Sequence, residues 1–223
     1  MREIDREFIE GALPFWKELR PEEKQRLEEG ISLRQLPAGT VIHGGTGDCD
    51  GLFLLRHGQV RVFIVSEGGK EITLYRLFER DICIFSASCA FKNISFDVMV
   101  ETVKDTEAYL IPTWLYQEFQ HKSLPISEYT NQLMASRFSD VMWIMEQTLF
   151  MSFDRRLALF LLEQSNIEGS DRLPITHDTI ARHMGTAREV VTRMLKYFAA
   201  EGIVELFRGG VVIKDRKKLL TYS

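Results

Sequence analysis

The chain contains 223 residues, of which 45% are hydrophobic and 27% are charged, and its formal net charge at pH 7 is −4. This composition is typical of a folded globular protein, and no apolar run reaches the roughly 18 residues that a membrane-spanning helix requires. The first residues, MREIDREFIEG, are too polar for a secretory signal peptide. Three cysteines (Cys49, Cys83 and Cys89) lack the C-x-x-C spacing and the neighbouring histidine of a zinc site, and an odd number cannot all pair within one chain. We therefore expect a reduced, cytoplasmic protein with no metal centre and no membrane partner.

The N-terminal half combines a helical start with a run of short strands. Residues 1–30 are expected to be helical, because Pro21 precedes two acidic residues that suit a first helical turn, and Gly30 should end that helix. From Ile31 to about Ile111, short β segments alternate with turns. The expected strands are residues 41–43, 52–55, 60–64, 72–75, 98–103 and 107–111. Short strands at such even spacing predict a β-sandwich or barrel.

One long helix is predicted from Ile126 to Met151, a stretch without glycine or proline. A mostly apolar seam recurs along it every three or four residues and would extend for roughly 35–40 Å. The seam consists of Tyr129, Leu133, Arg137, Val141, Ile144, Thr148 and Met151. Periodicity alone leaves two arrangements open, packing on the chain's own β domain or pairing with a second copy. Residues 152–154 should then form a hinge, with Asp154 as the N-cap of the next helix.

Two short helices joined by a tight turn are predicted between Leu173 and Lys196. The first carries apolar residues at helical spacing, namely Ile175, Ile180, Ala181 and Met184. Gly185 breaks the run, and Thr186 followed three residues later by Glu189 has the pattern of a capping box. The second helix is expected to bury Val190, Met194, Leu195 and Phe198. Its other face presents Arg188, Glu189, Thr192, Arg193 and Lys196.

That polar face has the chemistry that the DNA major groove requires, because arginine can bond guanine through two hydrogen bonds and glutamate can accept one from cytosine. A merely solvated helix face is the ordinary alternative. The two-helix spacing, the glycine in the turn and a β-wing from Ile203 to Ile213, with Arg208, Gly209 and Gly210 at its tip, favour DNA. From Arg172 onward ten basic residues face five acidic ones, a balance of +5, whereas the rest of the chain carries −9. Phosphate binding requires such a basic region.

The order of these residues resembles the DNA-binding domain of the Crp/Fnr superfamily of bacterial transcription regulators. The matching residues are Ile180, Ala181, Gly185, Arg188, Glu189, Arg193, Leu195, Glu201, Gly202 and Ile203. Upstream, the segments PAGTVI, LLRHGQVRVFI and EGGKEITLYRL resemble the β-roll sensor of the same superfamily. The resemblance covers nearly the whole chain and implies an α+β protein. Its parts would be a double-stranded β-helix (β-roll or jelly-roll) sensor in residues 1–124, a long dimerisation helix in 125–151 and a winged helix-turn-helix in 152–223.

The resemblance also implies a function, that of a homodimeric, sequence-specific regulator that binds double-stranded DNA, and RNA polymerase if it activates transcription. In relatives that bind cyclic AMP, residues at the positions of Arg188, Glu189 and Arg193 read the bases of a palindromic TGTGA-like site. Further DNA contacts are expected from Thr176, His177, Thr186, Thr192 and Lys196. Subunit contacts on the long helix are expected from Leu133, Arg137, Val141, Ile144 and Thr148.

The expected sensor departs from the cyclic-nucleotide pattern of the superfamily at three points. Relatives offer Gly-Glu to the ribose, Arg-Ser/Thr-Ala to the phosphate and Thr-Ser to the adenine. Here those positions fall on Ile84-Phe85, on residues 95–98, which contain no arginine, and on Val141-Met142. We therefore expect an unknown small-molecule effector other than cyclic AMP, uncharged or aromatic, in a more apolar pocket. The pocket residues would be Cys83, Ile84, Phe85, Ser86, Val141 and Met142.

Other signals stay open as alternatives. No cysteine precedes Cys49, which argues against a four-thiolate iron–sulfur cluster. We predict no cofactor, and the alternatives are haem held through Cys83, a thiol redox switch at Cys83 or Cys89, and a regulator that needs no ligand. The simplest interpretation of these two cysteines is that of small buried hydrophobes. A winged helix that binds protein rather than DNA is disfavoured by the basic C-terminal part, and an enzyme is not expected, because the chain has no nucleotide-binding loop and no Ser/His/Asp order.

Overall fold

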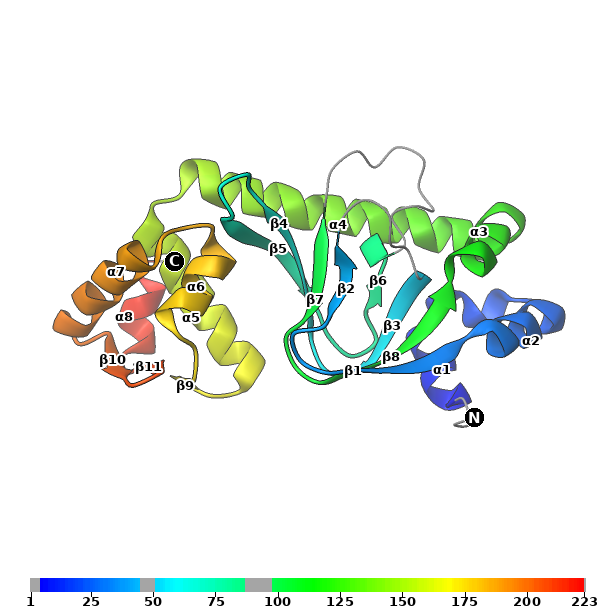
Figure 1. Cartoon of the computed structure of the whole chain (residues 1–223), viewed down its shortest axis with the longest axis horizontal. Coiled ribbons are helices and arrows are strands. Elements are labelled where there is room, and N and C mark those ends of the chain that lie inside the picture. Colours follow the sequence, from blue (N-terminus) through cyan, green and yellow to red (C-terminus); the bar gives the residue numbers. More distant parts are fainter. Residues whose placement is uncertain (1–4, 45–50, 87–97, 223) are drawn as a thin grey trace. The chain divides into compact units, whose positions relative to one another are not determined.

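The computed structural model describes residues 5–44, 51–86 and 98–222 (Figure 1). Its residues form two compact units. The first takes the chain up to Ile64 together with Leu74–Val141, and the second takes Val65–Thr73 together with the chain from Met142 onward. The long helix α4 (Leu124–Phe150) is divided between them.

The first unit begins with two helices joined by a 3₁₀ turn. Helix α1 (Arg6–Ala12) is capped by Asp5, whose side chain accepts a hydrogen bond from the Phe8 amide, and the turn η1 (Pro14–Glu18) follows. Helix α2 (Pro21–Gly30) starts and ends where its sequence predicts. The N–H of the first helical residue has no partner within the helix, so a proline, which lacks this N–H, costs nothing there. The following Glu22 and Glu23 suit the positive end of the helix dipole.

Two four-stranded sheets follow and form the predicted β-sandwich. Their strands are β1 (Ser32–Leu36), β2 (Val41–Gly44), β3 (Gly51–His57), β4 (Val60–Val65), β5 (Glu71–Leu77), β6 (Ile82–Cys83), β7 (Met99–Thr102) and β8 (Thr106–Pro112). One sheet has the order β1-β8-β3-β6 and the other β2-β7-β4-β5. The register pairs Phe53 with both Leu110 and Cys83, antiparallel in each case. Residues on both faces of β3 are buried because the short helix α3 (Thr113–Lys122) also contacts this strand.

Helix α4 packs one of its faces on this sandwich. Ile126 and Leu133 are buried in the same core as the strands, and Val141 packs partly against it. Tyr116 of α3 and Thr130 of α4 share a hydrogen bond of 2.6 Å between their hydroxyls. The helix begins two residues before the predicted start and ends one residue before the predicted end. Periodicity left two arrangements open for the predicted seam. Its first half packs on the chain's own β domain.

The second unit holds the remaining helices and a small sheet. Its elements are α5 (Phe153–Glu168), β9 (Arg172–Leu173), α6 (His177–Met184), α7 (Arg188–Ala200), β10 (Val204–Phe207), β11 (Gly210–Ile213) and α8 (Arg216–Leu220). The sheet order is β10-β11-β9, so β9, which the sequence did not reveal, completes the predicted wing. The prediction of Asp154 as N-cap was wrong, since Ser152 holds that position and Asp154 lies in the first turn. There its carboxylate accepts a hydrogen bond from Ser152, which lowers the pKa of Asp154.

Candidate nucleic-acid interface

The turn between α6 and α7 depends on Gly185. This residue adopts φ +67°, a left-handed conformation that residues with a side chain rarely accept. The Gly185 amide donates to the Ala181 carbonyl, and the next amide, that of Thr186, donates to the same carbonyl at 3.1 Å, so both residues of the turn close the end of α6. The prediction that Thr186 caps the second helix was therefore wrong. Ala187 occupies that position without a side-chain cap, and Glu189 lies in the first turn, where the helix dipole favours a carboxylate.

Helix α7 buries a slightly different face from the one predicted. Val191, Leu195 and Phe198 are completely buried in the core of the second unit, whereas Val190 is only half-buried and Met194 packs at the edge of that core. Val190 was predicted to be buried because it lies four residues before Met194, and Val191 lies four residues before Leu195 in the same way. Neighbouring residues lie about 100° apart around a helix, so Val190 and Val191 cannot both point into the core. Val191 points into the core, and the polar face therefore points outward.

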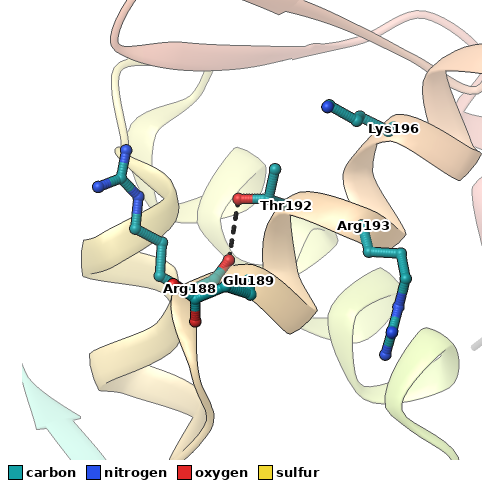
Figure 2. A pocket seen from close by; sticks show the side chains of 5 residues that line it. All are labelled: Arg188, Glu189, Thr192, Arg193 and Lys196. Atoms are coloured by element: carbon teal, nitrogen blue, oxygen red, sulfur yellow. Dashed lines mark hydrogen bonds between the residues drawn. The ribbon is translucent and has the colours of Figure 1, made fainter.

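The polar residues gather on that outward face. One concave surface is lined by Arg188, Glu189, Thr192, Arg193 and Lys196 (Figure 2). All of these except the half-buried Thr192 are exposed. In Figure 2 the charged ends of Arg188, Arg193 and Lys196 point in different directions along the helix. Within the described part of the chain, no carboxylate forms an ion pair with any of these three cations, and they remain available to an external acceptor.

Helix α6 adds two of the predicted residues next to this face. Thr176 is the N-cap of α6, and its hydroxyl accepts from the Thr179 amide at 3.1 Å. The Nδ1 atom of His177 lies 2.9 Å from the hydroxyl of Thr192, and that hydroxyl donates to the Arg188 carbonyl at 2.9 Å. Because a hydroxyl has one proton, Nδ1 of His177 must be the donor, and Nε2 remains for another partner. Burial first, and then the charges of Arg188 and Lys196, lower the pKa of His177, so its ring is neutral at pH 7.

The wing carries further cations. Strands β10 and β11 pair Phe207 with Gly210, and Arg208 is exposed at the tip, as the sequence predicts. Gly210 has no room for a side chain, because a Cβ there would collide with the Phe207 ring and the Leu173 carbonyl. The guanidinium carbon of Arg172 lies 3.9 Å from the centre of the Phe207 ring. Such a cation–π contact keeps a positive charge at the wing.

Comparison with known proteins agrees with this geometry. Residues 155–222 match a family profile described as the Crp-like helix-turn-helix domain. A crystal structure of a protein from Eubacterium rectale, described as a transcriptional regulator of the Crp/Fnr family, is 48% identical in sequence. It superposes with a TM-score of 0.93, over 95% of this chain and 98% of that one.

The chain belongs to the Crp/Fnr family. Curated relatives in this family include the cyclic AMP receptor protein of Thermus thermophilus, which is 26% identical over 91% of this chain and 93% of its own length. The anaerobic regulatory protein of Haemophilus influenzae is 23% identical over 94% of this chain and 82% of its own length. The protein is thus a transcription regulator of the Crp/Fnr type with a DNA-binding helix-turn-helix. No helix among the described residues is both long and apolar enough to cross a membrane.

The residues predicted for an effector pocket in this Crp/Fnr-family chain do not share one environment. Cys83, Ile84, Phe85 and Ser86 are all buried in the first unit, and the Ser86 hydroxyl lies 2.7 Å from the Gly51 carbonyl and 2.8 Å from that of Cys83. Val141 is half-buried, whereas Met142 is 39% exposed. Met142 is therefore more exposed to solvent than the other five residues.

The described cysteine has the character of a buried hydrophobe. Cys83 is fully buried, and burial raises the pKa of its thiol, although hydrogen bonds from Ser86 oppose the shift. A protonated, inaccessible thiol is a poor redox nucleophile and a poor haem ligand. The other cysteines, Cys49 and Cys89, lie outside the described residues, as do residues 95–97 of the missing phosphate cassette. The part of the chain that the structure describes holds no cluster of three or more metal-binding side chains.

Helix α4 of this Crp/Fnr-family chain exposes an apolar stripe beside the predicted dimer seam. Of the predicted seam residues, Leu133 lies inside the chain's own core, Arg137 contacts Tyr75, and Ile144 is half-buried. The exposed stripe consists of Phe138, Met142, Met145 and Leu149. Their spacing of four, three and four residues is that of a coiled-coil heptad. That α4 associates with a second copy, and which of its residues make that contact, stays a prediction.

Proposed function

We propose that the protein acts as a homodimer and binds a palindromic, TGTGA-like DNA site through α7. The observation that carries this proposal is the outward face of α7, where Arg188, Arg193 and Lys196 have no ion-pair partner among the described residues. Arg188 and Arg193 would each bond a guanine, and Glu189 would accept from a cytosine. Lys196 and the N-terminus of α6 would contact the DNA backbone and hold α7 in register. Thr192, bonded to His177 and Arg188, would fix the position of His177 beside it.

The exposed stripe of α4 supports the dimer. Phe138 is 68% exposed, Met145 47% and Leu149 63%, although large apolar side chains normally avoid water. Two copies of α4 that pack these stripes together would bury them in a coiled coil. A two-fold dimer places two α7 helices in successive major grooves, and half-sites about one helical turn apart follow.

The effector of this proposed dimer is a molecule other than cyclic AMP. Where the nucleotide-binding relatives have Gly-Glu, this chain has Ile84 and Phe85, and both are buried among apolar residues. Neither of these two side chains can form a hydrogen bond with a ribose hydroxyl. The buried, protonated thiol of Cys83 argues against haem ligation or thiol chemistry at that residue as the signal. If the protein activates transcription, RNA polymerase is its further partner.

The test is selection from randomised duplex DNA with the full-length protein, followed by gel-shift titration. We expect enrichment of a palindrome with TGTGA-like halves, and affinity that falls steeply with salt because phosphate contacts release counterions. Arg188→Ala should weaken binding and relax one position of the selected site. Arg155→Ala, which removes an exposed arginine from α5, is the matched control and should bind like the unmodified protein. Enrichment of no sequence would overturn the proposal.

A further inference from the structure

The first unit contains a buried contact between two polar side chains that DNA binding does not use. Tyr75 on β5 is 8% exposed, and the side chain of Arg137 on α4 is 12% exposed. The guanidinium carbon of Arg137 lies 4.7 Å from the centre of the Tyr75 ring. A cation over an aromatic face is attracted to the electrons of the ring, so this contact holds the two groups side by side.

Each of the two side chains keeps one unused hydrogen-bond donor. Among the residues that the structure describes, no group pairs with the Tyr75 hydroxyl or with Nε of Arg137, although both atoms are buried. Buried polar atoms are nearly always paired, so two unpaired ones in a single contact indicate a missing acceptor. Burial raises the pKa of Tyr75, with a contribution from Cys83 that Arg137 opposes, so the phenol keeps its proton and remains a donor.

The charge at this contact is already balanced. Nη1 of Arg137 donates to a carboxylate oxygen of Asp140 at 2.9 Å. An anionic ligand would therefore add an uncompensated negative charge to a largely buried place, which is costly, whereas a neutral ligand would not. The surroundings are apolar and aromatic, because the ring of Phe85 lies 6.2 Å from that of Tyr75 and the neutral thiol of Cys83 is close by.

We propose that Tyr75 and Arg137 form a subsite for an uncharged, planar aromatic ligand whose carbonyl oxygen accepts the two unused donors. The ring of the ligand would pack on the apolar side chains beside them. This inference rests on the proposed function for its regulatory meaning, since it names the chemical class of the effector. The binding itself can be measured without DNA.

The experiment titrates three probes into the full-length protein and follows them by ligand-observed NMR. Acetophenone combines the aromatic ring with a carbonyl acceptor, toluene lacks the acceptor, and benzoate adds a charge. We expect acetophenone to bind with a Kd about fivefold or more below that of either other probe, the equivalent of one net hydrogen bond. Tyr75→Phe should raise the Kd for acetophenone about fivefold. Tyr116→Phe is the matched control, because it removes another buried hydroxyl of this unit, one that is bonded to Thr130 at 2.6 Å.

Several outcomes would overturn the subsite. They are no acetophenone binding up to its solubility limit, tighter binding of benzoate, and equal affinity of Tyr75→Phe and the unmodified protein. Arg137→Met gives a second, independent measurement, and thermal unfolding of both variants reports whether they fold. Gel shifts on the same samples keep the two proposals apart. If the unmodified protein does not bind operator DNA, the proposed function is refuted. If Tyr75→Phe leaves the Kd for acetophenone unchanged, only the subsite is refuted.

Discussion

Truncation of the most exposed aromatic side chain in the α4 stripe should weaken self-association. Phe138 is 68% exposed in the single chain, and full burial of a phenylalanine contributes roughly 1.5–3 kcal/mol. About two thirds of that, roughly 1–2 kcal/mol, is therefore at stake in each subunit, and a two-fold dimer buries two copies. Phe138→Ala should thus cost about 2–4 kcal/mol, which raises the dimer dissociation constant about 30- to 700-fold.

Analytical ultracentrifugation with fluorescence detection, over a series of protein concentrations, measures this constant directly. The matched control is Trp114→Ala, because Trp114 is a large apolar residue on α3 with 61% exposure that does not belong to the stripe. Its dissociation constant should equal that of the unmodified protein. Equal constants for the Phe138 and Trp114 variants, or an unmodified chain that sediments as a monomer throughout, would refute the assignment of this stripe as the dimer interface.

Three further predictions concern the DNA-binding unit. Arg188→Ala should cost about 1–3 kcal/mol of operator binding and relax the preference at one base pair, as measured by gel shift on single-base variants of the site. A nearby DNA phosphate would favour the protonated His177 ring, so the pKa of His177 should be higher in the complex than in the unbound protein, where it is lowered. DNA affinity should therefore rise as the pH falls through the pKa in the complex and level off below the pKa in the unbound protein. His177→Gln should flatten this profile. Gly210→Ala should destabilise the unit by about 1–3 kcal/mol in thermal unfolding, because its Cβ would strike backbone as well as the Phe207 ring.

Each of these predictions has a result that contradicts it. For Arg188, a loss of affinity that is the same for every base substitution would indicate a phosphate contact instead of base reading. For His177, an affinity that falls with decreasing pH would mean that binding releases a proton and that the ring stays neutral in the complex. For Gly210, an unchanged melting temperature would show that the wing can move away from Leu173 without loss.

Much of the DNA-binding unit follows from local sequence. The turn at Gly185 and the wing tip at Arg208 were predictable, because a left-handed turn and a two-residue hairpin need particular residues within a few positions. The N-cap of α7 was not predictable. Thr186 has a better N-cap side chain than Ala187, but the Thr186 amide is bonded to the Ala181 carbonyl at the end of α6. Strand β9 also escaped prediction, because two residues become a strand only when β11 lies beside them.

The sequence by itself determined which residues share the outward face of α7, because helical periodicity is a local property and Arg188, Thr192 and Lys196 lie one turn apart. Only the tertiary structure decided which of two neighbouring seams on α4 is covered. Both have helical spacing, and the β-sandwich covers the first half of the seam through Leu133 and leaves the stripe through Phe138 exposed. The contact of Tyr75 with Arg137 likewise depends on the packing of α4 against β5. Such contacts join elements that are distant in sequence, so no local pattern specifies them.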